Sequence, residues 1–224
     1  VNPTQFNDRN DLLRYPRTLD ADLAACEKEG IDIVFAPDAP DMYTEGDATY
    51  VQVTGPLTES LEGAFRPGHF RGVTTVVAKL LSLAAPCHAA FGLKDYQQFR
   101  VITRMVQDLR LRAQLVAVPT VREPDGLALS SRNARLSPVD RQRASALFSA
   151  LKAGERAAAH GRRDPQDLEA LVRETLSPHV DGIDYVRLAN PRTLEPAPGG
   201  WTEATLLIAA EVGGVRLIDN LTLR

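Results

Sequence analysis

The first half of the chain alternates between two apolar patterns. Residues 18–29 carry apolar side chains at helical spacing as far as Gly30, a common residue at helix ends. Residues 31–36 form a short apolar run that stops at Pro37, which predicts a buried strand. The same two patterns predict further helices at 73–84 and 96–111 and further strands at 89–91 and 114–118. Helices that alternate with short, continuous apolar strands indicate a parallel sheet covered on both faces, as in a Rossmann-like α/β layout.

The pattern changes after about residue 118. An Ala-rich amphipathic helix is predicted over 138–160, and Asp164-Pro165 supplies a cap and a first-turn proline for another helix. Three β-rich runs follow, at 183–188, 204–211 and 215–221. Gly213-Gly214 between the last two runs predicts a tight hairpin. This half therefore reads as a small α+β domain.

We predict a domain boundary near residues 118–120, with an α/β domain over 1–118 and an α+β domain over 119–224. The chain opens on Val1-Asn2-Pro3, without an initiator Met, and these residues read as the end of a strand. We expect the α/β domain to be incomplete at its amino end.

Composition excludes some classes of function. The net charge of −3 and a pI near 5.8 give no general attraction to nucleic acid or to an anionic membrane. The longest apolar stretch, 73–91, is interrupted by Lys79, Pro86 and His88, so it does not read as a membrane span. Cys26 and Cys87 lie in apolar-patterned stretches and are predicted to be buried free thiols, which fits a cytoplasmic protein.

Gly92-Leu93-Lys94-Asp95 stands where a predicted strand passes into a helix. Ligands of open α/β sheets bind beyond the carboxyl ends of the strands, near helix N-termini that favour anions. Lys94 suits a phosphate and Asp95 can cap the helix. A surface lysine beside a capping aspartate explains the tetrapeptide equally well.

Ser130-Ser131-Arg132 follows a turn that contains Gly126. Two hydroxyls and a guanidinium in succession make a good phosphate clamp, although an ordinary polar loop has the same composition.

Two further groups of polar residues have an open interpretation. Asn2 and Gln5 lie near the same predicted sheet edge as Lys94, and carboxamides suit a substrate with hydroxyl and carboxylate groups. The basic, glycine-rich loop 66–72 could hold an anion or only form a turn. No pair of histidines has metal-ligand spacing, so no metal site is assigned.

Taken together, the segments resemble the pantothenate synthetase family, also called pantoate–β-alanine ligases. The resemblance runs in order from the first residue to the last, and the matching segments are Val1-Asn2-Pro3-Thr4-Gln5-Phe6, Tyr15-Pro16-Arg17-Thr18, Leu61-Glu62-Gly63, residues 66–73, Lys94-Asp95-Tyr96-Gln97-Gln98, residues 125–133 and Arg216-Leu217-Ile218-Asp219-Asn220.

Two departures stand out. Leu93 replaces the family's usual Glu, and the family's opening segment, which carries two histidines that meet the ATP phosphates, is not in this sequence. A chain without those histidines could bind ligands and yet fail to turn over.

The resemblance implies an α/β fold of the nucleotidylyl transferase type, with the second domain acting as a lid, and a reaction in two steps. Pantoate attacks Mg²⁺-bound ATP to give pantoyl adenylate and pyrophosphate, and β-alanine then displaces AMP. It also implies a homodimer, with no nucleic acid or membrane partner.

Residue by residue, the resemblance assigns pantoate to Gln5 and Gln98, and β-alanine to Asn2 and Gln5. Lys94, Asn2, Gln5 and Arg132 are the expected catalytic residues. The expected ATP-binding residues are Gly92, Leu93, Lys94, Asp95, Val121, Leu129, Ser130, Ser131 and Arg132.

Two alternatives stay open beside the ligase: a nucleotidyltransferase of the same fold that acts on a phosphorylated substrate, and an inactive fragment of a ligase.

Overall fold

The structure, a computed structural model, describes residues 1–7 and 9–224. Up to residue 118 it is mostly helical, with two strands. The elements of this N-terminal part are η1 (Pro3–Gln5), α1 (Arg9–Arg14), α2 (Leu19–Lys28), α3 (Ala39–Met42), α4 (Pro56–Glu59), α5 (Glu62–Phe65), α6 (His69–Ala84), β1 (Cys87–Gly92), η2 (Leu93–Asp95), α7 (Tyr96–Asp108) and β2 (Ala113–Val118).

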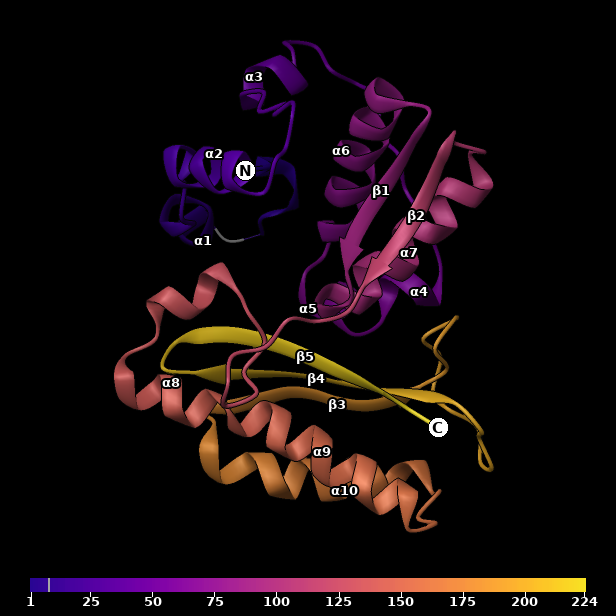
Figure 1. The fold of residues 1–224 in the computed structure, drawn as a ribbon. Coiled ribbons are helices and arrows are strands. Elements are labelled where there is room, and N and C mark those ends of the chain that lie inside the picture. Colours follow the sequence, from indigo (N-terminus) through magenta and orange to yellow (C-terminus); the bar gives the residue numbers. More distant parts are fainter. Residues whose placement is uncertain (8) are drawn as a thin grey trace.

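Strands β1 and β2 form a parallel pair, as predicted, in a register that sets Gly92 opposite Val118. Helices α6 and α7 pack against one face of the pair (Figure 1). The core under that face contains Val73, Ile102 and Met105. The other face is uncovered within the described residues, so the expectation that both faces are covered is wrong there. Successive side chains of a strand point to opposite faces of the sheet. In β1 and β2 one set of side chains therefore points toward α6 and α7, and the other set is exposed.

The predicted strand at 31–36 is also wrong. These residues follow α2 in an irregular extended path, and all six are exposed, with Ile33 at 84%. A strand needs a partner for its backbone groups, and no strand of the described residues pairs with this segment. Apolar composition alone therefore did not determine its structure.

After residue 118 the chain forms a three-stranded sheet and two long helices. The elements of this C-terminal part are η3 (Ser131–Arg135), α8 (Pro138–Ala144), α9 (Ala146–Ala159), α10 (Pro165–Leu176), η4 (Ser177–His179), β3 (Gly182–Ala189), β4 (Ala204–Val212) and β5 (Val215–Leu223). The strands are antiparallel in the order β3-β4-β5, and the predicted hairpin joins β4 to β5 through Gly213-Gly214, both with positive φ.

Helices α9 and α10 lie side by side across one face of this sheet (Figure 1). Their apolar stripes meet the strands in a core that includes the fully buried Leu151, Leu168, Leu206 and Ile208. The helix predicted over 138–160 is divided at Ser145, whose hydroxyl donates to the carbonyl of Gln142 at 2.8 Å. Such local bonds compete with the helical ladder.

The opposite face of the three-stranded sheet packs against the N-terminal part. Tyr185 and Leu207 of the sheet meet Leu61 of the loop before α5 in a second apolar cluster. The predicted fold class is therefore confirmed: a parallel sheet with helices is joined to a smaller antiparallel α+β unit. The boundary near residue 118 stays a prediction.

Two expectations about the chain as a whole can be compared with the described residues. Cys26 and Cys87 are free, as predicted, but half-buried rather than buried. None of the described helices combines the length and the apolar character needed to cross a membrane.

Candidate active site

The carboxyl ends of β1 and β2 lie together and send out the two loops that carry most of the predicted ATP residues. Beyond Gly92 the chain turns through η2, which contains Lys94, into α7. Asp95 occupies the N-cap position of α7, but its side chain makes no capping hydrogen bond, so the predicted cap is not formed. The Lys94 side chain is half-buried and forms no hydrogen bond or ion pair with the residues that the structure describes. An ammonium in this setting is available to a ligand.

A cavity of ≈ 390 Å³ between the two parts brings the predicted loops together. Its walls include Lys94 and Asp95 from the first loop and Ser130 and Arg132 from the second. Three further guanidinium groups face it, those of Arg66, Arg135 and Arg216. These five cations outnumber by one the four carboxylates of the same lining, Asp11, Glu62, Asp95 and Asp184, so the cavity favours an anionic ligand such as the phosphates of a nucleotide.

Four of these cations have internal partners. Asp11 on α1 accepts from Arg132 at 2.9 Å and from Arg135 at 2.7 Å. Burial raises the pKa of Asp11, but the bonds and charges of the two arginines outweigh it and hold the pKa below its ordinary value. An incoming phosphate would have to compete with Asp11 for Arg132.

Arg216 on β5 clamps Glu62 on α5 through two bonds of 2.7 Å each, and the Tyr185 hydroxyl donates to the same carboxylate at 2.9 Å. Glu62 is only 5% exposed. Arg66 lies 3.8 Å from the Glu62 carboxylate. These contacts tie the wall of the cavity in the N-terminal part to the three-stranded sheet.

A small recess of ≈ 30 Å³ adjoins the cavity and shares Lys94 with it. Gln98, a predicted pantoate residue, lines this recess, and its amide makes no hydrogen bond within the described part of the chain. The neighbouring Gln97 is 3% exposed. Its side-chain nitrogen donates to the carbonyls of Leu57 and Ser60, and its side-chain oxygen accepts from the Glu62 backbone N–H. Gln97 is thus structural, whereas Gln98 is free to meet a ligand.

Asn2 and Gln5 are joined to each other. The Asn2 amide donates to Gln5 Oε1 at 2.9 Å and to the Gly72 carbonyl at 3.2 Å. Gly72 permits this approach of η1 to α6, since a β-carbon there would lie 2.4 Å from the Thr4 carbonyl oxygen. Neither Asn2 nor Gln5 lines the cavity or the recess.

The loop at 66–72 connects Gln5 to the recess. The Gln5 carbonyl accepts from Arg66 at 3.2 Å and from His69 Nδ1 at 2.8 Å. Burial, followed by the Arg66 charge, lowers the pKa of His69 to about 4, so its ring is neutral at pH 7. A carbonyl can only accept, and Nδ1 therefore carries the proton. The loop acts here as a support for Gln5.

The other predicted ATP residues lie outside the linings of the cavity and the recess: Gly92, Leu93, Val121, Leu129 and Ser131. Val121 and Leu129 are exposed and sit opposite each other, because the Leu129 amide donates to the Val121 carbonyl at 3.0 Å. The Ser131 hydroxyl instead donates to the Tyr15 hydroxyl at 3.1 Å.

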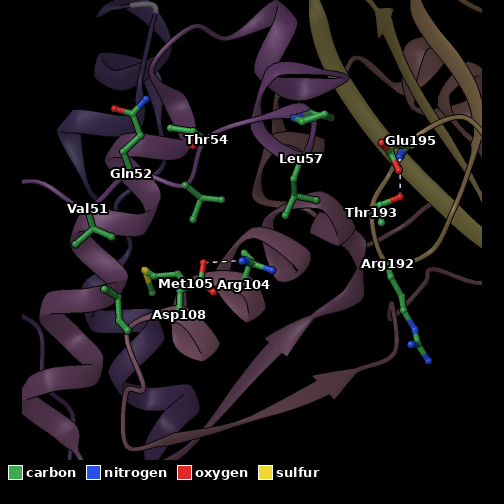
Figure 2. Close-up of a pocket in the computed structure, with 13 residues that line it drawn as sticks. Val51, Gln52, Thr54, Leu57, Arg104, Met105, Asp108, Arg192, Thr193 and Glu195 are labelled. Carbon is green, nitrogen blue, oxygen red and sulfur yellow. Dashed lines mark hydrogen bonds and ion pairs between the residues drawn. The ribbon is translucent and has the colours of Figure 1, made fainter.

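A larger cavity, of ≈ 480 Å³, lies away from these residues, between the segment 51–57, the end of α7 and the loop after β3 (Figure 2). Its floor includes Val51 and Met105, and the Arg104–Asp108 ion pair crosses its rim. None of the predicted site residues lines it, so size alone does not identify the candidate site.

Sequence reasoning left several residues of the cavity without a role. Three of these residues belong to segments that carry the family resemblance, namely Glu62, Arg66 and Arg216. The sequence did not predict that the two arginines would pair with Glu62. Asp11 had no signal of this kind, since a single aspartate on a short polar helix is ordinary.

No group of three or more His, Cys, Asp or Glu side chains suited to a metal ion occurs among residues 1–7 and 9–224. Asp95 faces the cavity without an ion-pair partner among these residues and can make an outer contact to a phosphate-bound ion. Mg²⁺ on a nucleotide often keeps its waters and needs only one or two carboxylates, so this donor set fits an ion carried in by the phosphates.

The fold and the cation-lined cavity at the strand ends define an α/β protein of the nucleotidyltransferase type. The sequence pattern of the family described as Pantoate-beta-alanine ligase matches residues 1–222. The chain belongs to this family.

Individual relatives agree. The pantothenate synthetase of Myxococcus xanthus (strain DK1622) is 52% identical over 228 residues, which span 100% of this chain and 77% of that protein. The crystal structure of pantothenate synthetase from Thermus thermophilus superposes with a TM-score of 0.93 at 47% identity, over 98% of this chain and 80% of that one. The Francisella tularensis pantoate-beta-alanine ligase, complexed with beta-gamma ATP and beta-alanine, has a TM-score of 0.79 at 32% identity, over 99% and 76%.

Proposed function

We propose that this chain condenses pantoate with β-alanine at the expense of ATP, through a pantoyl adenylate. The observation that carries the proposal is the cavity in which Lys94, Ser130 and Arg132 meet, within a chain of this family. The relative from Francisella tularensis was solved in complex with beta-gamma ATP and β-alanine, which supports the same ligands here.

In the first step the pantoate carboxylate attacks the α-phosphorus of ATP and pyrophosphate leaves. Lys94 and Arg132 offset the charge that develops on the phosphates, and Mg²⁺ bound to the nucleotide would shield it further. In the second step the β-alanine amine attacks the acyl carbon, and AMP leaves. No protein nucleophile is required, because the two substrates and ATP supply every reacting group and the protein positions them.

Substrate contacts are proposed from the same geometry. Gln98 presents its carboxamide to the recess beside Lys94, so pantoate would lie in the adjoining cavity with one polar group reaching this recess. Gln5, whose Oε1 is held by Asn2, would turn its amide nitrogen toward the substrates. Val121 and Leu129, adjacent and exposed beside the Ser130 loop, would cover the adenine ring.

The proposal includes a homodimer and a cytoplasmic location. Exposed apolar side chains of the N-terminal part, among them Tyr50, Val116 and Val118, support association, and the free thiols of Cys26 and Cys87 support a reducing compartment. Sedimentation equilibrium tests the first point: a mass of a single chain at micromolar concentration would refute the dimer.

The test of function is an omission assay. With ATP, Mg²⁺, pantoate and β-alanine present, AMP and pantothenate should form in equal amounts. Without β-alanine, pantoate should still drive the exchange of labelled pyrophosphate into ATP, and without pantoate the exchange should cease. AMP formation that ignores both substrates would refute the ligase.

The same assay separates the two alternatives. A nucleotidyltransferase acting on a phosphorylated substrate would release pyrophosphate without AMP. ATP binding without turnover would indicate a fragment that lacks catalytic groups. To test this, the rate of the chain is compared with that of a chain extended by the opening segment of a relative. A rate that rises only in the extended chain would indicate the inactive fragment. Equal rates would show that the segment is not needed for turnover.

A further inference from the structure

Strand β5 of the C-terminal sheet runs directly against the Lys94 loop. The Asn220 carboxamide nitrogen donates to two successive carbonyls of that loop, those of Leu93 and Lys94, at 2.9 Å each. Asn220 is only 8% exposed. Both hydrogens of one NH₂ group are thereby used to hold the turn that carries the Lys94 ammonium.

The residue before Asn220 holds the other wall of the cavity. The Asp219 carboxylate, 3% exposed, accepts two bonds from the Arg122 guanidinium, at 2.6 and 2.9 Å. Arg122 also donates to the Gly126 carbonyl at 3.0 Å and lies 4.0 Å from the Phe148 ring centroid. Arg122 therefore anchors the hairpin that leads into the Ser130 loop.

The two anchors are neighbours in the chain and are linked further by two hydrogen bonds: the Asn220 backbone N–H donates to Asp219 Oδ1 at 2.8 Å, and Arg122 donates to the Asn220 carbonyl at 3.4 Å. A movement of this dipeptide would shift Lys94 and the Ser130–Arg132 loop together. The segments it joins are more than 90 residues away in sequence, and each of them follows a strand of the parallel pair.

We propose that Asn220, seated on Asp219, is a positioning residue that sets the spacing between the Lys94 wall and the Ser130–Arg132 wall of the ATP site. This inference rests on the proposed function for its ligand and extends it to β5. The chemistry selects the residue type: an aspartate of the same shape has no hydrogens to donate, and its charge would repel the carbonyls of Leu93 and Lys94.

The experiment compares Asn220→Asp and Asn220→Ser with the unmodified chain. Losing two neutral hydrogen bonds at a ligand site should weaken ATP binding by roughly tenfold or more for Asn220→Asp, and by less for Asn220→Ser, which keeps one donor. Pantoate binding measured without ATP should weaken as well, because Asn220 and Lys94 both line the recess that also contains Gln98. Isothermal titration measures both.

Thr222→Val is the matched control. Thr222 lies two residues further along β5 and loses a comparable polar contact, its 3.2 Å hydroxyl pair with Thr205, without touching the Lys94 loop. It should leave ATP affinity unchanged. A purely structural role for Asn220 would lower the unfolding temperature while ATP affinity remained within twofold of the unmodified chain, and that result would overturn the inference.

Hydrogen exchange keeps the inference separate from the proposed function. Peptides spanning residues 92–98 should exchange faster in Asn220→Ser than in the unmodified chain, with or without a nucleotide, and unchanged exchange would overturn the inference. If the unmodified chain binds no ATP, the proposed function fails instead. If Asn220→Asp does not fold, Asn220→Ser carries both measurements.

Discussion

The two sheets of this molecule are packed very differently. In β4 every residue but Glu211 is buried, whereas no residue of β1 or β2 is. The antiparallel sheet lies between α9 and α10 on one face and the N-terminal part on the other, and the parallel pair is covered on one face within the described residues (Figure 1).

The candidate site lies where the two regions meet, and they contribute different things to it. The loops that leave the parallel pair supply the Lys94 ammonium and the Ser130–Arg132 segment. The antiparallel sheet supplies anchors, namely Arg216 on Glu62 and Asn220 on the Lys94 loop. We infer that substitutions in the loops change activity with little loss of stability, and that substitutions in the core of the antiparallel sheet, away from its anchor Asn220, do the reverse.

Lys94→Ala should give the largest change. Because one preorganised cation at the phosphates is removed, AMP formation should fall by roughly two to three orders of magnitude. The unfolding temperature should stay the same, since the ammonium has no partner to lose among the described residues. Lys152→Ala on α9, which removes an ion pair with Glu155, is the control and should leave the rate unchanged. A near-normal rate for Lys94→Ala would exclude its proposed role.

Two isoleucines test how much packing in each region contributes to the free energy of unfolding. Ile208 on β4 is fully buried, and Ile33 is 84% exposed. Ile208→Ala should cost about 3 kcal/mol of unfolding free energy, within the range for buried aliphatic truncations. Ile33→Ala should cost less than about 0.5 kcal/mol. Urea denaturation measures both, and an equal cost would show that residues 31–36 are packed in solution.

Local sequence patterns predicted most of the helices and strands, but they predicted less well which faces of these elements are covered. Alternating helices and strands, the Asp164-Pro165 start of α10 and the Gly213-Gly214 hairpin all depend on nearby residues, and all are present. The miss at 31–36 has a physical reason: strand formation needs a neighbour, and a short apolar run does not say whether one is there.

The site residues also differ in how well the sequence predicts them. Lys94 and Ser130–Arg132 stood out because each follows a turn at a strand or loop end. Their anchors did not, since Glu62 and Arg216 are 154 residues apart and Asn220 reaches Lys94 across 126 residues. Asn2 and Gln5 were predicted at the same sheet edge as Lys94, and among the described residues Gln5 is hydrogen-bonded to Arg66 and His69 of the recess.

The buried ion pair between the two regions gives the smallest expected effect, and it depends on pH. Burial raises the pKa of Glu62, but the hydrogen bonds and charge of Arg216, with help from Tyr185 and Arg66, outweigh it and lower the pKa below 4.5. A carboxyl with a lowered folded-state pKa stabilises the fold above its unfolded pKa. That contribution is lost as the pH falls through the folded value.

Glu62→Gln should therefore destabilise the chain by about 1–2 kcal/mol at pH 7 and by progressively less below about pH 4.5. Buried His69, with its pKa lowered to about 4, adds a loss of stability between about pH 6.5 and 4. The Glu62 charge acts to raise the pKa of His69, so the comparison is made in a His69→Asn background, which removes this second titration. Glu174→Gln on the exposed side of α10 is the control, with no difference expected at either pH. Urea denaturation at pH 7 and pH 3.5 gives the comparison, and a deficit that stays constant between the two would mean that the Glu62–Arg216 bond does not stabilise the junction through its charge.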